Sequence, residues 1–219
     1  VYRGIKDQCA KYHLNILGGD TVRTEGPMVW TVTIIGDVPK GTAIMRSGAQ
    51  VGDIVGITNY VGYAATGLGA LSYNLDGYHM TKVGHQRPDP QIELGQQLRQ
   101  LGIHSMNDIS DGLGSELNEI ASASNVSIVI EEKAIPLHEE TYELAKYLQT
   151  NPVDYALYGG EDFQLVFTAT KSLLPKLENL AGITIIGEVV SGPAQVQMVT
   201  PDKTIKTIEA KGYNHFHES

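Results

Sequence analysis

The sequence is poor in cysteine and in positive charge. Cys9 is the only cysteine among 219 residues, which excludes an intrachain disulfide and fits a reducing, cytoplasmic location. The 16 Lys and Arg residues are outnumbered by 25 Asp and Glu residues, so the formal net charge is −9. This balance argues against bulk binding to nucleic acid or to an anionic membrane. A phosphate-bearing ligand would then depend on metal ions or on the N-terminal ends of helices.

Several signature patterns are also absent. No apolar run is long enough to span a bilayer, and we expect no signal peptide at the start of the chain. The sequence has no Walker-type glycine-lysine loop, no dinucleotide-binding Gly-x-Gly-x-x-Gly and no serine nucleophile elbow. Its seven histidines include no set with the spacing of a metal site. What is present is a chain with 42% hydrophobic residues, enough for a substantial core.

The order of helix and strand patterns predicts an α+β fold with a mixed sheet packed against helices. Helices and strands are interleaved, but several strands follow one another directly near the end of the chain. The turn at 37–41 predicts a domain boundary that separates residues 1–37 from residues 38–219. Two prolines predict that residues 85–90 form an extended loop. Helices are expected at 2–13, 63–74, 91–101, 113–124, 139–149 and 171–180, and strands at 29–36, 54–58, 126–131, 164–168, 183–189, 195–199 and 203–208.

An acidic run, Asp108-Ile-Ser-Asp-Gly-Leu113, lies where a strand or loop leads into the helix expected at 113–124. One interpretation is structural, because Asp and Ser oxygens commonly cap the free N–H groups of a helix start. The other is functional, because paired carboxylates hold hard cations such as Mg²⁺ beside the phosphates of a nucleotide. The run alone leaves both interpretations open.

Three further segments have the same ambiguity. Gly18-Gly-Asp-Thr21 is either a plain turn or a carboxylate on a backbone that can approach a phosphate closely. Arg46 is either a solvated surface side chain or a donor to phosphate. Tyr158-Gly-Gly-Glu-Asp-Phe163 is similar to the Gly-Gly-Asp-Glu-Phe hairpin of diguanylate cyclases, although Asp162 stands where those enzymes have Glu. That enzyme class is a remote alternative.

Six segments in a fixed order resemble the thiamine-monophosphate kinase family. They cover nearly the whole chain, and the family belongs to a superfamily with aminoimidazole ribonucleotide synthetase, selenophosphate synthetase and a hydrogenase maturation protein. The segments are Leu17-Gly-Gly-Asp-Thr21, Arg46-Ser-Gly-Ala-Gln-Val-Gly-Asp53, His85 with Arg87-Pro-Asp-Pro90, Asp108-Ile-Ser-Asp-Gly-Leu113, Tyr158-Gly-Gly-Glu-Asp-Phe163 and Gly212-Tyr-Asn-His-Phe216.

The resemblance implies Mg²⁺-dependent, in-line transfer of the γ-phosphoryl group of ATP to thiamine monophosphate, which gives thiamine diphosphate. The positions that match the family's functional residues fall into four groups. The Mg²⁺ ligands of the family are matched by Asp20, Asp108 and Asp111, and the catalytic pair is matched by Asp108 and Asp111. The nucleotide contacts are matched by Gly19, Asp20, Arg46 and Ser110. The contacts to thiamine monophosphate are matched by Glu161 and Tyr213.

The resemblance also implies that the chain lacks most of an N-terminal domain. Residues 1–37 would be the end of an ATP-binding domain and residues 38–219 the C-terminal domain of the aminoimidazole ribonucleotide synthetase-like fold. We expect the full-length protein to be a homodimer and the 219-residue chain alone to be inactive or nearly so. Tyr63 and Ala64 depart from the family, which usually has polar or small residues there. Another ATP-using enzyme of the superfamily and a non-catalytic binding or assembly module are the alternatives.

Overall fold

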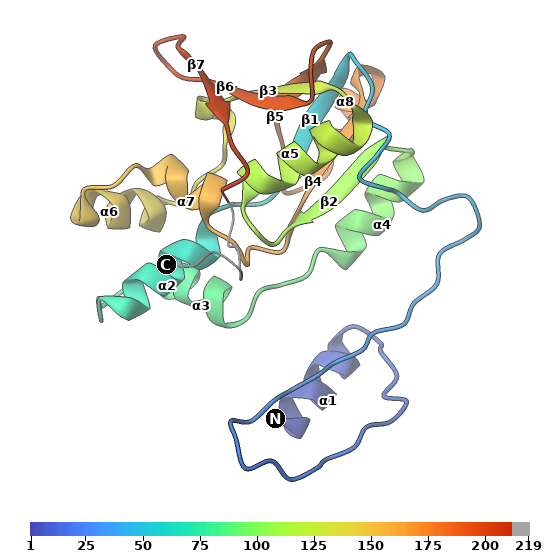
Figure 1. Ribbon diagram of the computed structural model, residues 1–219, viewed down its shortest axis with the longest axis vertical. Coiled ribbons are helices and arrows are strands. Elements are labelled where there is room, and N and C mark those ends of the chain that lie inside the picture. The colour runs from blue at the N-terminus through green and yellow to red at the C-terminus, as the bar shows by residue number, and fades with distance from the viewer. Residues whose placement is uncertain (212–219) are drawn as a thin grey trace. The chain divides into compact units, whose positions relative to one another are not determined.

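The computed structural model describes residues 1–211 and divides into two compact units, Val1–Asp37 and Val38–Ser219. The first unit contains helix α1 (Tyr2–Lys11), as predicted, followed by irregular chain (Figure 1). The ring of Trp30 meets that of Tyr2 edge-on, with centroids 6.2 Å apart. This aromatic pair links the helix to the irregular segment that follows it.

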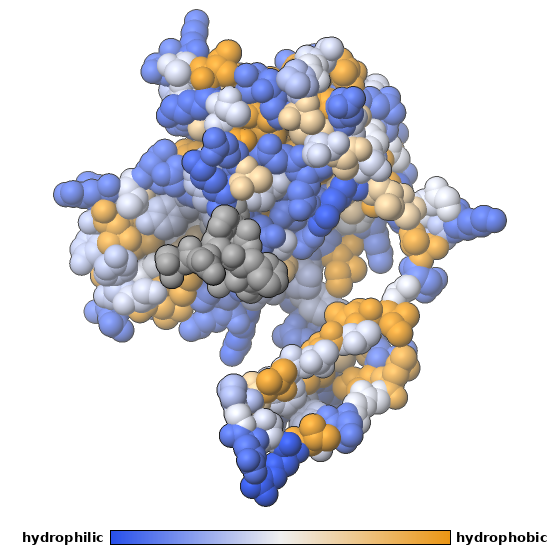
Figure 2. Space-filling view, in the orientation of Figure 1, coloured by the Kyte–Doolittle hydropathy of each residue, from blue (hydrophilic) through white to orange (hydrophobic). Residues whose placement is uncertain are grey.

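The strand predicted at 29–36 is wrong. Residues 1–37 contain no second extended segment in register with it, and a strand persists only when its backbone groups pair with a neighbour. Large apolar side chains of this segment are therefore exposed, among them Val29, Val32 and Ile35. Figure 2 shows apolar surface interspersed with polar surface on this unit.

The second unit is built on a seven-stranded mixed sheet, so the predicted α+β class is confirmed. The strand order is β2-β4-β1-β5-β3-β6-β7, and every neighbouring pair is antiparallel except β3 and β6. The strands are β1 (Asp53–Thr58), β2 (Ser105–Ile109), β3 (Ser127–Glu131), β4 (Gln164–Thr170), β5 (Ile183–Val190), β6 (Gln195–Val199) and β7 (Ile205–Ile208).

Helices cover both faces of this sheet (Figure 1). One face packs against α5 and α7, whose apolar residues Leu117, Ile120 and Leu157 are almost completely buried. The opposite face packs against α4 and α8 around Phe167, Leu98 and Leu177. The helices of this unit are α2 (Tyr63–Ser72), α3 (His79–Gln86), α4 (Ile92–Leu101), α5 (Leu113–Ser124), α6 (Glu139–Leu148), α7 (Pro152–Tyr158) and α8 (Leu174–Leu177), with single 3₁₀ turns at Glu132–Ala134 and Lys171–Leu173.

The helix pattern differs from expectation in three places. His85 lies in the last turn of α3 and not in an extended loop, because Pro88 restricts only the residue immediately before it. The predicted helix at 171–180 is a 3₁₀ turn followed by α8, which begins beside Pro175, where a missing N–H is harmless. Helix α7 was not expected, although Asn151 and Pro152 are a typical helix start. No helix within residues 1–211 is both long enough and apolar enough to cross a bilayer.

Gly187 gives a test of how tightly the sheet is packed. It lies in β5 between β1 and β3, and a Cβ atom there would be 2.1 Å from the carbonyl oxygen of Val129. Because this neighbour is backbone, we expect Gly187→Ala to lower the free energy of unfolding by about 2 kcal/mol or more. Urea unfolding followed by circular dichroism measures the change.

Gly95 provides the matched control. It lies inside α4, and a Cβ atom there would meet only the flexible side chains of Leu165 and Met106, at ordinary contact distances. Gly95→Ala should leave stability unchanged or raise it by up to about 1 kcal/mol, because alanine favours helix. Equal stability of the two variants would contradict this description of the sheet.

Candidate active site

The acidic run forms the turn that joins β2 to α5. Asp108 and Asp111 are exposed, whereas Ile109 between them is completely buried in the core. Gly112 follows with φ +100°, and a Cβ atom there would be 2.7 Å from the carbonyl oxygen of Leu157. The core therefore fixes the backbone of this turn, and the two carboxylates face solvent.

The capping interpretation of the acidic run is wrong. The N-cap residue of α5 is Gly112, and no side chain caps this helix. Within residues 1–211, neither Asp108 nor Asp111 uses its carboxylate in a hydrogen bond. Both carboxylates therefore remain available to a ligand.

Glu116, a residue that no sequence motif singled out, lies beneath this turn. Its carboxylate accepts hydrogen bonds from the Asp111 N–H at 3.2 Å and the Ser110 hydroxyl at 3.4 Å. The pKa of Glu116 is raised to about 7, mainly by burial and further by the negative charges of Glu119, Asp108 and Asp111, although the hydrogen bond from the Asp111 N–H lowers it. An acidic residue in the first turn of the helix after an acidic run was the signal that could have identified it.

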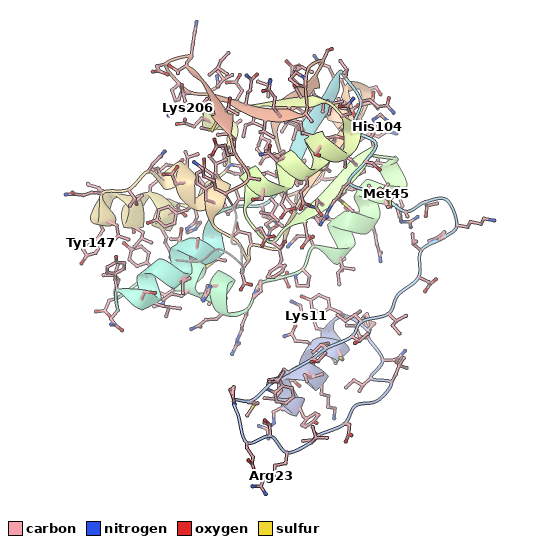
Figure 3. The ribbon with its side chains drawn as sticks, in the orientation of Figure 1. Lys11, Arg23, Met45, His104, Tyr147 and Lys206 are labelled. Atoms are coloured by element: carbon pink, nitrogen blue, oxygen red, sulfur yellow. The ribbon has the colours of Figure 1, made fainter. Side chains whose placement is uncertain are left out.

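Arg46 is held beside the acidic turn. Its Nε donates to Oδ1 of Asn107 at 3.1 Å and forms an ion pair with Oε2 of Glu119, at an N–O distance of 3.0 Å. The loop that carries it is anchored to α5, because the Ser124 hydroxyl accepts from the N–H groups of residues 48 and 49 at 3.1 Å each. The same loop contacts β2, because the carbonyl oxygen of Met45 accepts from the N–H of Met106 at 3.1 Å. Figure 3 labels Met45 and also His104, the residue immediately before β2. Arg46 and the acidic run are therefore brought together in the folded chain.

The Gly-Gly-Glu-Asp segment is joined directly to the same turn. The N–H groups of Glu161 and Phe163 donate to the carbonyl oxygens of Ser110 and Ile109 at 2.8 and 2.9 Å. A Cβ atom at Gly160 would be 2.3 Å from the Ser110 oxygen, so this approach requires glycine. The segment connects α7 to β4 and is not a hairpin, which rules out the diguanylate cyclase interpretation. Glu161 is exposed beside the acidic turn.

Asp162 has a different role from its neighbour Glu161. It is 5% exposed, and its carboxylate accepts from the N–H groups of Gly62 at 2.6 Å and Ala64 at 2.8 Å. It thus caps the start of α2 from a distant part of the sequence. Burial raises its pKa to about 6, although these N–H groups and that of Tyr63 act in the opposite direction.

Three of the residues expected at the site cannot be placed beside it. Gly19 and Asp20 belong to the first unit, where the Asp20 carboxylate accepts from the N–H of Thr21 at 2.7 Å. Tyr213 lies outside the described residues. Within residues 1–211, no three His, Cys, Asp or Glu side chains converge in an arrangement that would itself hold a metal ion.

Comparison with known families defines the class of protein to which this fold and site belong. Residues 51–199 match the family described as AIR synthase related protein, C-terminal domain. Hydrogenase maturation protein HypE from E. coli, at 20% identity and a TM-score of 0.67 over 83% of this chain and 56% of that chain, shares the fold.

More similar relatives narrow the class. Thiamine-monophosphate kinase of Bacillus subtilis (strain 168) is 37% identical over 99% of this chain and 69% of its own length, and the Haemophilus influenzae (strain Rd) enzyme is 35% identical over 95% and 66%. The structure of AaThiL complexed with AMPPCP and TMP has a TM-score of 0.68 at 33% identity, covering 79% of this chain and 54% of that chain. The chain belongs to the thiamine-monophosphate kinase family, and it spans about two thirds of the length of these curated relatives.

The buried carboxyl of Asp162 predicts a specific pH dependence of stability. The Asp162 carboxyl binds its proton more tightly in the folded state, where its pKa is about 6, than in the unfolded chain, where its pKa is the ordinary 3.8. The contribution of Asp162 to the free energy of unfolding therefore falls as the pH rises from about 4 to about 6. Asp162→Asn cannot ionise. We expect the stability of the original protein relative to this variant to fall by up to about 3 kcal/mol between about pH 4 and pH 7. Urea unfolding across that range measures the difference, and a constant difference would contradict the pKa.

Proposed function

We propose that this protein transfers the γ-phosphoryl group of ATP to thiamine monophosphate, forming thiamine diphosphate, with Mg²⁺ at the acidic turn. The observation that carries the proposal is the direct backbone contact between the acidic run and the Gly-Gly-Glu-Asp segment. Through that contact the candidate metal-binding carboxylates lie beside Glu161, the candidate contact to thiamine. The family membership and the bound AMPPCP and TMP of the AaThiL structure support the same reaction.

The donor set of the acidic turn fits a hard divalent cation. Asp108 and Asp111 offer exposed carboxylates that no neighbouring donor within residues 1–211 uses, and Ser110 lies between them. Oxygen ligands of this kind suit Mg²⁺, which keeps several waters and is bound through one or two carboxylates together with phosphate. Burial is the main cause of the raised pKa of Glu116, and the surrounding negative charge adds to it; a bound cation would relieve that second contribution. When bound, Mg²⁺ would supply neutralisation of phosphate charge.

The other side chains would position the two anionic substrates. The hydrogen bond and the ion pair of Arg46 both use Nε, so its terminal nitrogens are not engaged within residues 1–211 and could donate to a phosphate. Glu161 would face the positively charged part of thiamine. The attacking phosphate oxygen is already ionised, so the reaction needs alignment and charge neutralisation and no general base.

Several expectations from the sequence belong to the same proposal. Residues 1–37 would be the end of the ATP-binding domain, with Gly19 and Asp20 at the nucleotide and Asp20 as a further metal ligand. Tyr213 would stack on the thiamine ring, since a cation is attracted to an aromatic face. The full-length protein would be a homodimer in the cytoplasm.

A direct assay tests the reaction. The protein is made at the full length that its gene encodes and is incubated with ATP, Mg²⁺ and thiamine monophosphate, and thiamine diphosphate is measured by chromatography. We expect product that requires all three components. Consumption of ATP with a different acceptor, and no thiamine diphosphate, would favour another enzyme of the superfamily, whereas no ATP turnover with any acceptor would favour a binding module.

Asp108→Asn tests the proposed metal ligand. The amide keeps the size of the side chain but is a weaker ligand for a hard cation, so turnover should fall by roughly a hundredfold or more. Because Asp108 is exposed, the melting temperature should change little. Asp76→Asn makes the same chemical change in the loop between α2 and α3 and should leave the rate unaltered. A normal rate for Asp108→Asn at saturating Mg²⁺ would reject the assignment.

A further inference from the structure

Glu116 is the most deeply buried acidic side chain near the acidic turn, with 2% of its surface exposed. It lies in the first turn of α5, and it is too enclosed to meet a substrate directly. Burying a carboxylate costs free energy unless hydrogen-bond donors surround it, so the position of Glu116 needs a physical reason. The donors that surround it supply one.

Three donors converge on this carboxylate, and all three come from the strand and turn that carry the proposed metal ligands. One oxygen accepts from the N–H of Asp111 and the hydroxyl of Ser110. The other oxygen accepts from the side-chain amide of Asn107. These three residues flank Asp108 and include Asp111, so the carboxylate ties the side chains of Asn107 and Ser110 and the backbone N–H of Asp111 to α5.

Asn107 extends the same network to Arg46. Its amide oxygen accepts from Nε of Arg46 at 3.1 Å, while its amide nitrogen donates to Glu116 and, at 3.0 Å, to Glu119. The orientation of the Asn107 amide is therefore set by the carboxylates on one side and the guanidinium on the other. One buried carboxylate thus contributes to the placement of both the acidic turn and the arginine.

We propose that Glu116 is a positioning residue for phosphoryl transfer. It holds Asp108, Ser110 and Asp111 in the arrangement that binds the metal and nucleotide, and it holds Arg46 through Asn107. The inference rests on the proposed function, and it assigns to Glu116 no contact with a substrate. Its carboxylate is required because both of its oxygens accept hydrogen bonds. A glutamine at 116 would have an NH₂ group in place of one oxygen, and this group would face one of the three donors without accepting from it.

The test compares Glu116→Gln with a variant that restores the pairing. Glu116→Gln alone should lower kcat/KM by about tenfold or more and raise the Mg²⁺ concentration needed for half-maximal rate, on the scale of a lost charged hydrogen bond. In the double variant N107D/E116Q, the new amide at 116 can donate to the new carboxylate at 107, which still accepts from Arg46. We expect it to recover to within about threefold of the original rate, short of full recovery because the new carboxylate at 107 faces Glu119 where the Asn107 amide had donated.

Controls separate positioning from loss of fold. Glu143→Gln makes the same chemical change on the exposed surface of α6 and should leave rate and Mg²⁺ requirement unchanged. Thermal unfolding of each variant reports the folded fraction. A variant that is merely less stable loses active protein but keeps its KM for nucleotide and its Mg²⁺ requirement.

Each outcome has a distinct meaning. A shifted Mg²⁺ requirement in Glu116→Gln, with recovery in the double variant, supports the positioning role. If Glu116→Gln matches the original protein, or if N107D/E116Q is no better than Glu116→Gln, the inference is overturned while the proposed function stands. If the original protein at its encoded full length forms no thiamine diphosphate, the proposed function fails and the inference fails with it.

Discussion

The site depends on one backbone junction, at which Glu161 and Phe163 donate to the carbonyl oxygens of Ser110 and Ile109. These two hydrogen bonds extend the contact between the end of β2 and the segment that leads into β4. They bring together two segments that are distant in the sequence and that resemble different functional parts of one family. Gly160 permits the approach, because any side chain would collide with the Ser110 oxygen.

Four of the carboxyl groups around this junction differ in how deeply they are buried. Asp162 is buried against the free N–H groups at the start of α2, which offset part of the cost of its charge. Glu116 is buried against donors of the acidic turn, but three further carboxylates surround it. Asp108 and Asp111 are exposed to solvent. The two carboxyl groups that hold the structure together, Asp162 and Glu116, are therefore buried, whereas the two that are available to a ligand, Asp108 and Asp111, are exposed.

Elements with a clear local pattern were predicted from the sequence, whereas two errors concern segments whose structure depends on contacts between distant parts of the chain. The periodicity of α4, α5 and α6 and the β-branched run of β3 are local properties, and these elements were predicted closely. Helix α3 was missed because its start is capped by Glu140, which accepts from the N–H of Thr81 at 2.8 Å across a long stretch of sequence. The strand expected at 29–36 failed for the opposite reason, since apolar alternation without a partner does not make a sheet.

The same distinction applies within the site. The resemblance identified the residues that a family shares at its motifs, such as Arg46 and Asp111, and the structure brings these together. It gave a role to Glu161 but none to the adjacent Asp162, whose carboxylate is buried against the start of α2. Nor did the resemblance identify Glu116, which belongs to no motif. The proposed role of Glu116 rests on the hydrogen bonds that it accepts from Asn107, Ser110 and Asp111. Residues that contact a ligand can be recognised by type and spacing, whereas residues that position them are visible only through the contacts of the folded chain.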